Sequence, residues 1–143
     1  FLQYGFTVAI YLARHAKAYT QWLWLKKWSP ADCCPQLQDH NGYTMPMYLA
    51  RHASADVLRL WLEKWSPADC CPQLQNKAGR TVAMELAQYG SPNVHRLWLK
   101  KWSPADFCPQ LQDKTGFTVA TYLALHATSG VQRLWQEKLA AIN

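Results

Sequence analysis

The sequence predicts an all-α fold in which four helical hairpins of similar sequence stack into a repeat solenoid. Two observations support this prediction. A Gly-x-Thr segment returns every 37 residues, and each copy holds two short stretches whose apolar residues recur at helical spacing. Two short helices cannot close a core alone, but stacked copies bury a continuous one. We therefore expect a single repeat domain with long connectors and little or no β-hairpin.

The units of the repeat follow from landmarks that keep one order in every copy. A Leu-Ala pair and then a Leu-Trp pair come after each Gly-x-Thr segment. The four glycines that set the frame are Gly5, Gly42, Gly79 and Gly116. The resulting units span about 1–38, 39–75, 76–112 and 113–143.

The two end units differ in polarity. Gln136 in the last unit stands where the unit before it has Leu99, and an end repeat must show a wetter outer face. The first unit keeps the apolar residues Val8, Ile10 and Leu12. We therefore expect the chain to be the C-terminal part of a longer array.

Each unit is expected to contain two helices, which are described here for the second unit. The first helix runs from Thr44 to Ala53, with the hydroxyl of Thr44 as N-cap acceptor. The second helix runs from about Asp56 to Trp65. The apolar stripes expected to be buried are Met45, Tyr48, Leu49 and Ala53 in the first helix, and Val57, Leu60, Trp61 and Trp65 in the second.

The connector after the second helix reads WSPADCCPQLQ in the second unit. Ser66 followed by Pro67, with Asp69 in the first turn, is the pattern of a helix start. It predicts a further short helical turn in each connector. Ser29, Ser66 and Ser103 also fit proline-directed phosphorylation, and the sequence leaves their modification open.

The cysteines number five and follow the repeat. Phe107 in the third connector replaces Cys33 and Cys70 of the first two, so this position is expected to pack as a buried hydrophobe. The remaining thiols belong to copies that lie roughly 10 Å apart, beyond disulfide reach; they are Cys34, Cys71 and Cys108. No C-x-x-C or spaced histidine pair completes a zinc site. We expect reduced thiols and no bound metal.

Composition sets further bounds on function. A net charge of +6 favours acidic partners. No apolar run approaches the roughly 20 residues of a membrane-spanning helix, so no membrane span is expected. Unpaired cysteines and the lack of a visible export signal favour an intracellular location, although the compartment stays open.

The histidines invite a catalytic interpretation, which the sequence does not support. His15, His52 and His126 recur at one repeat position without a nucleophile and an orienting acid in the same unit. No glycine-rich phosphate loop or paired carboxylates are present. We expect no catalytic residues, no enzymatic activity and no cofactor.

The unit NGYTMPMYLARHASADVLRLWLEKW resembles an ankyrin repeat. Positions that match the ankyrin pattern are Gly42, Thr44, Ala50, Ala53, Val57, Leu60 and Leu62, and Asp39 and Asp113 match its hairpin aspartate. The resemblance implies a right-handed solenoid. The histidine of the family's Thr-Pro-Leu-His segment is missing, and the unit has 37 residues instead of about 33, with the surplus in the connector.

The resemblance also implies a function: a non-enzymatic scaffold that binds another protein through its concave face. Ankyrin-like proteins use the residues around the hairpin glycine and the exposed side of the first helix. Carried over position by position, the expected partner-binding residues are Phe6, Arg14, His15, His40, Asn41, Tyr43, Arg51, His52, Lys77, Arg80, Gln88, Tyr89, Lys114, Phe117 and His126. Aromatic and arginine side chains are common interface anchors.

Two alternatives remain open at this point. The alike units could stack end to end between molecules of this chain and form a filament. A weaker alternative is binding of nucleic acid or another acidic polymer by a basic column. That column consists of Arg59, Arg96 and Arg133, with Lys64, Lys100 and Lys101 beside it.

Overall fold

The computed structural model describes residues 7–141 and is all-α, as predicted: those residues form eight α-helices and contain no strand. The helices are α1 (Val8–His15), α2 (Ala18–Lys27), α3 (Met45–His52), α4 (Ala55–Lys64), α5 (Val82–Tyr89), α6 (Pro92–Lys101), α7 (Val119–His126) and α8 (Ser129–Ala140). Three 3₁₀ helices, η2 (Ala31–Cys33), η3 (Ala68–Cys70) and η4 (Pro104–Phe107), lie in the connectors.

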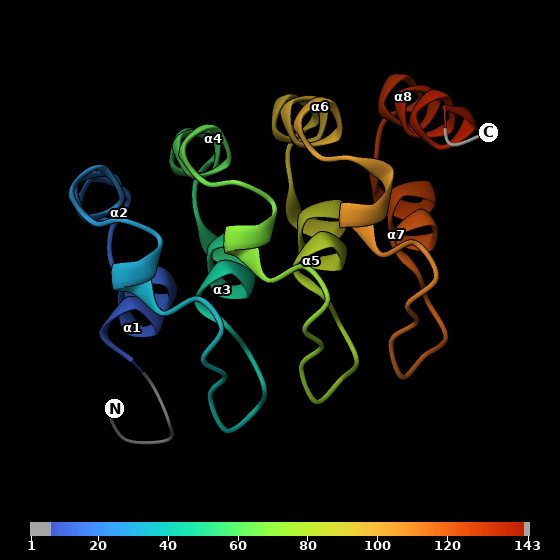
Figure 1. Ribbon diagram of the computed structural model, residues 1–143. Coiled ribbons are helices and arrows are strands. Elements are labelled where there is room, and N and C mark those ends of the chain that lie inside the picture. Colours follow the sequence, from blue (N-terminus) through green and yellow to red (C-terminus); the bar gives the residue numbers. More distant parts are fainter. Residues whose placement is uncertain (1–6, 142–143) are drawn as a thin grey trace.

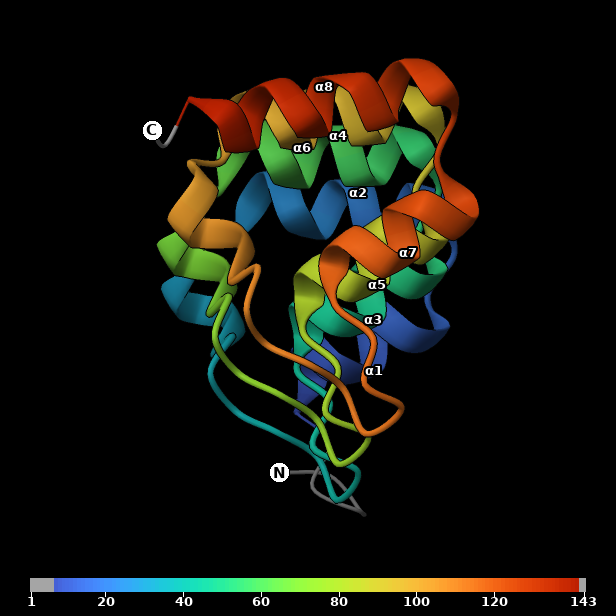
Figure 2. The same cartoon turned by 90° about the vertical axis from the view of Figure 1, so that its right-hand side faces the viewer.

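The helices form two rows (Figure 1). Each odd-numbered helix contacts the odd-numbered helix of the next unit, and the even-numbered helices contact one another in the same way. The turned view shows the even row above the odd row, with the 3₁₀ helices on the side away from the odd row and extended turns reaching beyond it (Figure 2). Helices equivalent in sequence are therefore neighbours in space.

Side-chain caps start the helices. The predicted cap at Thr44 is confirmed, because its hydroxyl accepts the Met47 amide; the threonines before α1, α5 and α7 do the same. The second helix begins one residue earlier than predicted, at Ala55, because Ser54 accepts the Val57 amide.

The buried stripe of α4 also differs from the prediction. Leu60 is only half buried, whereas Leu58 and Leu62 are buried. The reason is that α4 is flanked by a neighbour on each side, α2 and α6, so it buries more of its circumference than one stripe.

The connectors contain the predicted short helical turn. Asp69 accepts the amide of Ser66, and the Asp69 amide is bonded in turn to the serine hydroxyl. The shared packing position is confirmed, because Cys33, Cys70 and Phe107 are all buried. A feature absent from the prediction is the left-handed backbone after each turn, at Cys34, Cys71 and Cys108 (φ 47°, 50° and 46°).

Hydrogen bonds between units hold the 37-residue register. The Lys77 amide donates to the Asn41 carbonyl at 3.0 Å, which links two successive turns. The Gln38 side chain, at the end of the first unit, donates to two carbonyls of the second unit, those of Gly42 (2.9 Å) and Gln75 (3.1 Å). The Gln75 side chain repeats this pattern one unit further on. A slip of one residue would break all of these bonds.

Lysines add a second type of bond between units. Lys64 at the end of α4 donates to the carbonyls of Leu25 and Trp28, which end helix α2 of the preceding unit. Lys101 does the same for Leu62 in α4. A cation at helix C-terminal carbonyls also complements the helix dipole, so these lysines stabilise the stack.

We expect Gly42→Ala to lower the free energy of unfolding more than Gly116→Ala. Both glycines have left-handed φ (79° and 84°), which costs a residue with a Cβ about 1 kcal/mol or more. A Cβ on Gly42 would in addition lie 2.9 Å from the backbone of Asn76, whereas Gly116 has open space. Urea denaturation of the two variants measures the difference. An equal decrease in the free energy of unfolding for both variants would show that close packing between successive turns does not contribute to the effect.

His95 bonds the carbonyl at the end of the first helix in the third unit, where the first unit uses a glutamine. Its Nε2 lies 2.8 Å from the Leu86 carbonyl at the end of α5, and the Gln21 amide donates to the equivalent carbonyl, that of Leu12, at 3.1 Å. A Cβ on Gly90 would lie 2.9 Å from the imidazole ring. Gly90 therefore makes room for His95, where the other units have alanine.

Burial lowers the pKa of His95 below 6.5, so the folded protein binds a proton there less readily than the unfolded chain. Stability from this group is complete above pH 6.5 and falls as the pH drops below it, by at most about 1.4 kcal/mol per pH unit. His95→Gln should keep the bond to Leu86 and remove this dependence. Chemical denaturation at pH 7.5 and 5.5 gives the free energy of unfolding of both proteins. An equal decrease between the two pH values in both proteins would show that His95 is not the cause of the pH dependence.

Candidate functional site

One face of the molecule, which we call the odd-helix face, combines helices α1, α3, α5 and α7 with the turns at 39–43, 76–80 and 113–117. Its acidic and basic side chains differ in solvent exposure. Its three carboxylates are all buried: Asp39, Glu85 and Asp113. Its basic side chains and histidines are exposed or half buried: Arg14, His15, His40, Arg51, His52, Lys77, Arg80, Lys114 and His126. Among the described residues, the solvent side of this face carries positive charge only.

Arginines on this face lie over tyrosines of the following unit. The Arg14 guanidinium is 5.6 Å from the Tyr48 ring centroid, and Arg51 is 5.0 Å from that of Tyr89. Arg80 repeats the contact with the fourth unit, at 4.6 Å from the centroid of Tyr122. Each contact is a cation–π interaction, so the ladder joins units and presents guanidinium groups beside aromatic rings.

Aspartate and tyrosine form a buried pair in the second and fourth units. The Tyr48 hydroxyl donates to Asp39, and the Tyr122 hydroxyl donates to Asp113. Burial and the hydrogen bond to Asp39 both raise the pKa of Tyr48. Burial would raise the pKa of Asp113, but its hydrogen bonds outweigh burial and lower it. These acids hold the turns and are not available to a partner.

The third unit replaces this pair by an ion pair. Asn76 stands at the aspartate position and Glu85 at the tyrosine position. Glu85 is fully buried and accepts from Arg80 at 2.7 Å. Arg80 also donates to Gln88 at 2.6 Å. Burial opposes the charge of Arg80, but the bond to Glu85 outweighs it and raises the pKa of the guanidinium.

Arg51 stands next to this ion pair and stays open to solvent. Its Nη1 donates to the Tyr43 hydroxyl at 3.0 Å and lies 3.9 Å from the second oxygen of Glu85. About a third of its side chain is exposed (34%), against 12% for Arg80. Arg51 can therefore bind a partner group, whereas Arg80 is engaged inside the protein.

A depression of about 450 Å³ lies on this face between the first and second units. It is lined by Arg14, His15, Asn41, Tyr43, Tyr48, Arg51 and His52. The Tyr43 and Tyr48 rings are stacked, with centroids 4.8 Å apart. Six of the seven lining residues were expected at a partner surface from the sequence, and Tyr48 is the addition.

The other sequence-predicted residues fall in different places on the same face. Lys77 and Lys114 are exposed in the turns, and Tyr89 and His126 are exposed at the ends of their helices. Phe117 is half buried. Phe6 lies outside the described residues.

Four of the five thiols show little nucleophilic character. Burial raises the pKa of Cys33 to about 12, and burial also raises the pKa of Cys70, Cys71 and Cys108. Protonated thiols are poor nucleophiles and metal ligands. Within residues 7–141, no three His, Cys, Asp or Glu side chains come together in a way that could hold a metal ion.

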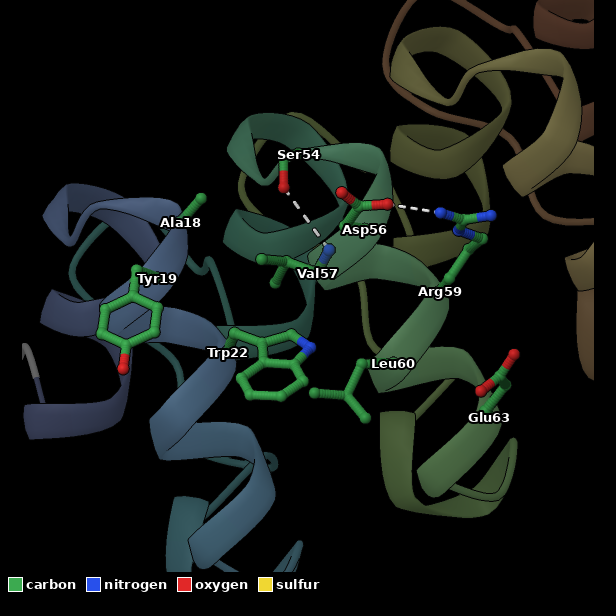
Figure 3. A pocket seen from close by; sticks show the side chains of 9 residues that line it. All are labelled: Ala18, Tyr19, Trp22, Ser54, Asp56, Val57, Arg59, Leu60 and Glu63. Atoms are coloured by element: carbon green, nitrogen blue, oxygen red, sulfur yellow. Dashed lines mark hydrogen bonds and ion pairs between the residues drawn. The ribbon is translucent and has the colours of Figure 1, made fainter.

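A second hollow lies on the even row, between α2 and α4 (Figure 3). Tyr19 and Trp22 of α2 line it, and Trp22 faces Leu60 of α4. The other units have Arg59, Arg96 or Arg133 where the first has Trp22. The sequence prediction missed this aromatic pair, although a comparison of the copies at this position would have revealed it.

The basic column considered for nucleic acid is partly engaged in other contacts. Lys64 and Lys101 cap the preceding even-numbered helices, as described above. Arg59 is paired with Asp56 within α4, and Arg96 lies 3.4 Å from Asn93. Fewer cations are therefore free to follow phosphates than the sequence suggested.

Comparisons with known proteins add little. No protein-family model and no curated protein matches the chain. A chain in the solved structure of the predatory endopeptidase from Bdellovibrio bacteriovorus in complex with an immunity protein is similar, with a TM-score of 0.37 and 15% identity over 96% of this chain and 83% of that one. Likeness at this level carries no argument about function. No helix in the described part of the chain is long and apolar enough to span a membrane.

We expect Arg80→Ala to lower the free energy of unfolding by about 3 kcal/mol, because the buried carboxylate of Glu85 would lose its ion-pair partner. The triple variant Asn76→Asp/Arg80→Phe/Glu85→Tyr installs the residues of the fourth unit and should recover most of that loss. Chemical denaturation measures both. A triple variant as unstable as Arg80→Ala would show that the two arrangements are not interchangeable.

Proposed function

We propose that the chain is an ankyrin-type repeat solenoid and acts as a non-enzymatic scaffold that binds another protein through its odd-helix face. The single observation that carries the proposal is the charge separation on that face, where every acid is buried while most bases and the rings of Tyr43 and Tyr89 are exposed or half-buried. Arginine and tyrosine at a central position are typical anchors of protein interfaces.

The ankyrin-type assignment is supported by the arrangement of each unit. An extended turn with a left-handed glycine leads into a threonine-capped helix, and a second helix returns beside it. Backbone bonds join successive turns, as between Lys114 and Ala78 at 2.9 Å. Such turns beside a row of first helices are where the resemblance to ankyrin repeats implies partner contacts.

A second candidate function is self-association through the outer side of α1. Val8 and Tyr11 are exposed there by 55% and 51%, whereas the equivalent Met45 and Tyr48 are buried against the preceding unit. A further copy of the chain could cover this surface in the same manner. A contact of this kind between different ends does not close and produces filaments.

The double variant Arg51→Ala/Tyr89→Ala should lose a protein partner that the native chain retains. Truncating two interface anchors costs about 2 kcal/mol or more, which is roughly 30-fold in affinity. Tyr19→Ala/Arg59→Ala is the matched control, since it removes one tyrosine and one arginine from the even row. Partners captured by the native chain are identified, purified and titrated against all three proteins.

The outcomes of this titration separate the candidates. Weakening by the first variant alone supports the odd-helix face, and weakening by the control alone moves binding to the hollow between α2 and α4. Light scattering at rising concentration is measured on the same preparations. Self-association would replace the scaffold proposal if two results are obtained together. The particle mass of the native chain grows with concentration but that of Val8→Glu does not, and the native chain captures no other protein.

A further inference from the structure

We propose that the depression between α1 and α3 is a pocket for one anionic side chain of the partner, either a carboxylate or a phosphorylated residue. The proposal rests on the proposed function and names the group that the odd-helix face recognises. Two arginines, two histidines and an asparagine surround the pocket above the stacked rings of Tyr43 and Tyr48.

The composition of this pocket is unique among the three crevices between units. Its arginine position carries Arg14 in the first unit and Arg51 in the second, but Gln88 in the third and Leu125 in the fourth. Each crevice lies between two neighbouring units. The first crevice is therefore the one that has an arginine at this position in both of its units. The second crevice also contains the carboxylate of Glu85, which neutralises part of its charge.

Asp39, whose partners line the pocket, does not compete for these cations, and Glu85, 3.9 Å from Arg51 Nη1, is fully buried. Asp39 is buried and accepts the amides of Asn41 at 2.9 Å and Tyr43 at 3.0 Å, together with the Tyr48 hydroxyl. Its oxygens are thus engaged in the turn. An incoming anion would meet guanidinium and imidazole N–H groups, while both nearby carboxylates stay buried.

The local electrostatics agree with this geometry. The pKa of His52 is lowered by burial, and further by Arg51, Arg14 and His15. Positive charge that disfavours a further proton on His52 also attracts an anion. An arginine can bind a carboxylate or phosphate through two parallel N–H groups. The polar contacts of Arg51 with Tyr43 and Glu85 both involve its Nη1.

The test uses three short glycine-serine peptides that differ at one central residue: glutamate, phosphoserine or serine. Each is titrated into the full chain while the imidazole signals of its five histidines are followed by NMR. We expect the glutamate or the phosphoserine peptide to shift the signals of His15 and His52 and to leave His95 and His126 unchanged. The arm that binds more tightly identifies the carboxylate or the phosphate as the preferred anion.

Arg51→Gln should weaken this binding about tenfold, since it removes a charge-assisted hydrogen bond. Arg59→Gln on the even row is the matched control and should bind as the native chain does. Because Arg51 also contacts Tyr43, Arg14→Gln serves as a second, more exposed variant, and circular dichroism confirms that each variant is folded.

Three results would overturn the proposal: equal binding of the serine peptide, equal shifts of His126, or no loss in either arginine variant. Tighter binding of a short single-stranded DNA at the same histidines would reassign the pocket to nucleic acid and also overturn it. If no peptide binds but Arg51→Ala/Tyr89→Ala still loses a protein partner, the anion pocket is rejected. The proposed scaffold function is then retained.

Discussion

The structure depends on one constraint: a pair of short helices cannot cover its own apolar side. The α-helices within residues 7–141 have 8 to 12 residues, a length at which an isolated helix is marginal in water. Tyr48 in α3 is buried against the preceding unit, while its equivalent in α1, Tyr11, is half exposed. The bonds between Gln38 and Gln75 and between Lys64 and α2 act at this same boundary. Stability therefore resides between the units.

This constraint divides the positions of each unit into two kinds. Positions at the boundary are restricted by the neighbour, as at Gly42, whose missing Cβ admits the next turn. Exposed positions on the odd-helix face meet solvent and differ between the copies. The third unit shows that even a buried position can change when its partners change together, since Glu85 in place of tyrosine comes with Arg80 and with Asn76 in place of aspartate. Two carboxylates side by side are thereby avoided.

The parts of the fold that could be predicted are those that a single unit determines. The threonine cap at Thr44, the turn that begins at Ser66 and the buried site of Cys33 follow from residues close in sequence or from comparing copies. Lys64 reaching the end of α2 could not be predicted, because its acceptors lie in another unit and its sequence context is that of a solvated helix face. Arg80 remains a predicted partner-binding residue. Its ion pair could not be predicted, because it depends on the complete burial of Glu85 by neighbouring units.

The recognition proposed for the odd-helix face is separable from stacking, as a comparison of the copies shows. Gln88 and Leu125 occupy the position of Arg14 and Arg51, yet α5 and α7 pack on each other as α1 and α3 do. The arginines are therefore not required for the contact between units. Exposed guanidinium groups that repel one another cost stability where no anion is present. Their concentration at a single crevice, on a face whose carboxylates are all buried, is better explained by what the crevice binds than by how the units pack.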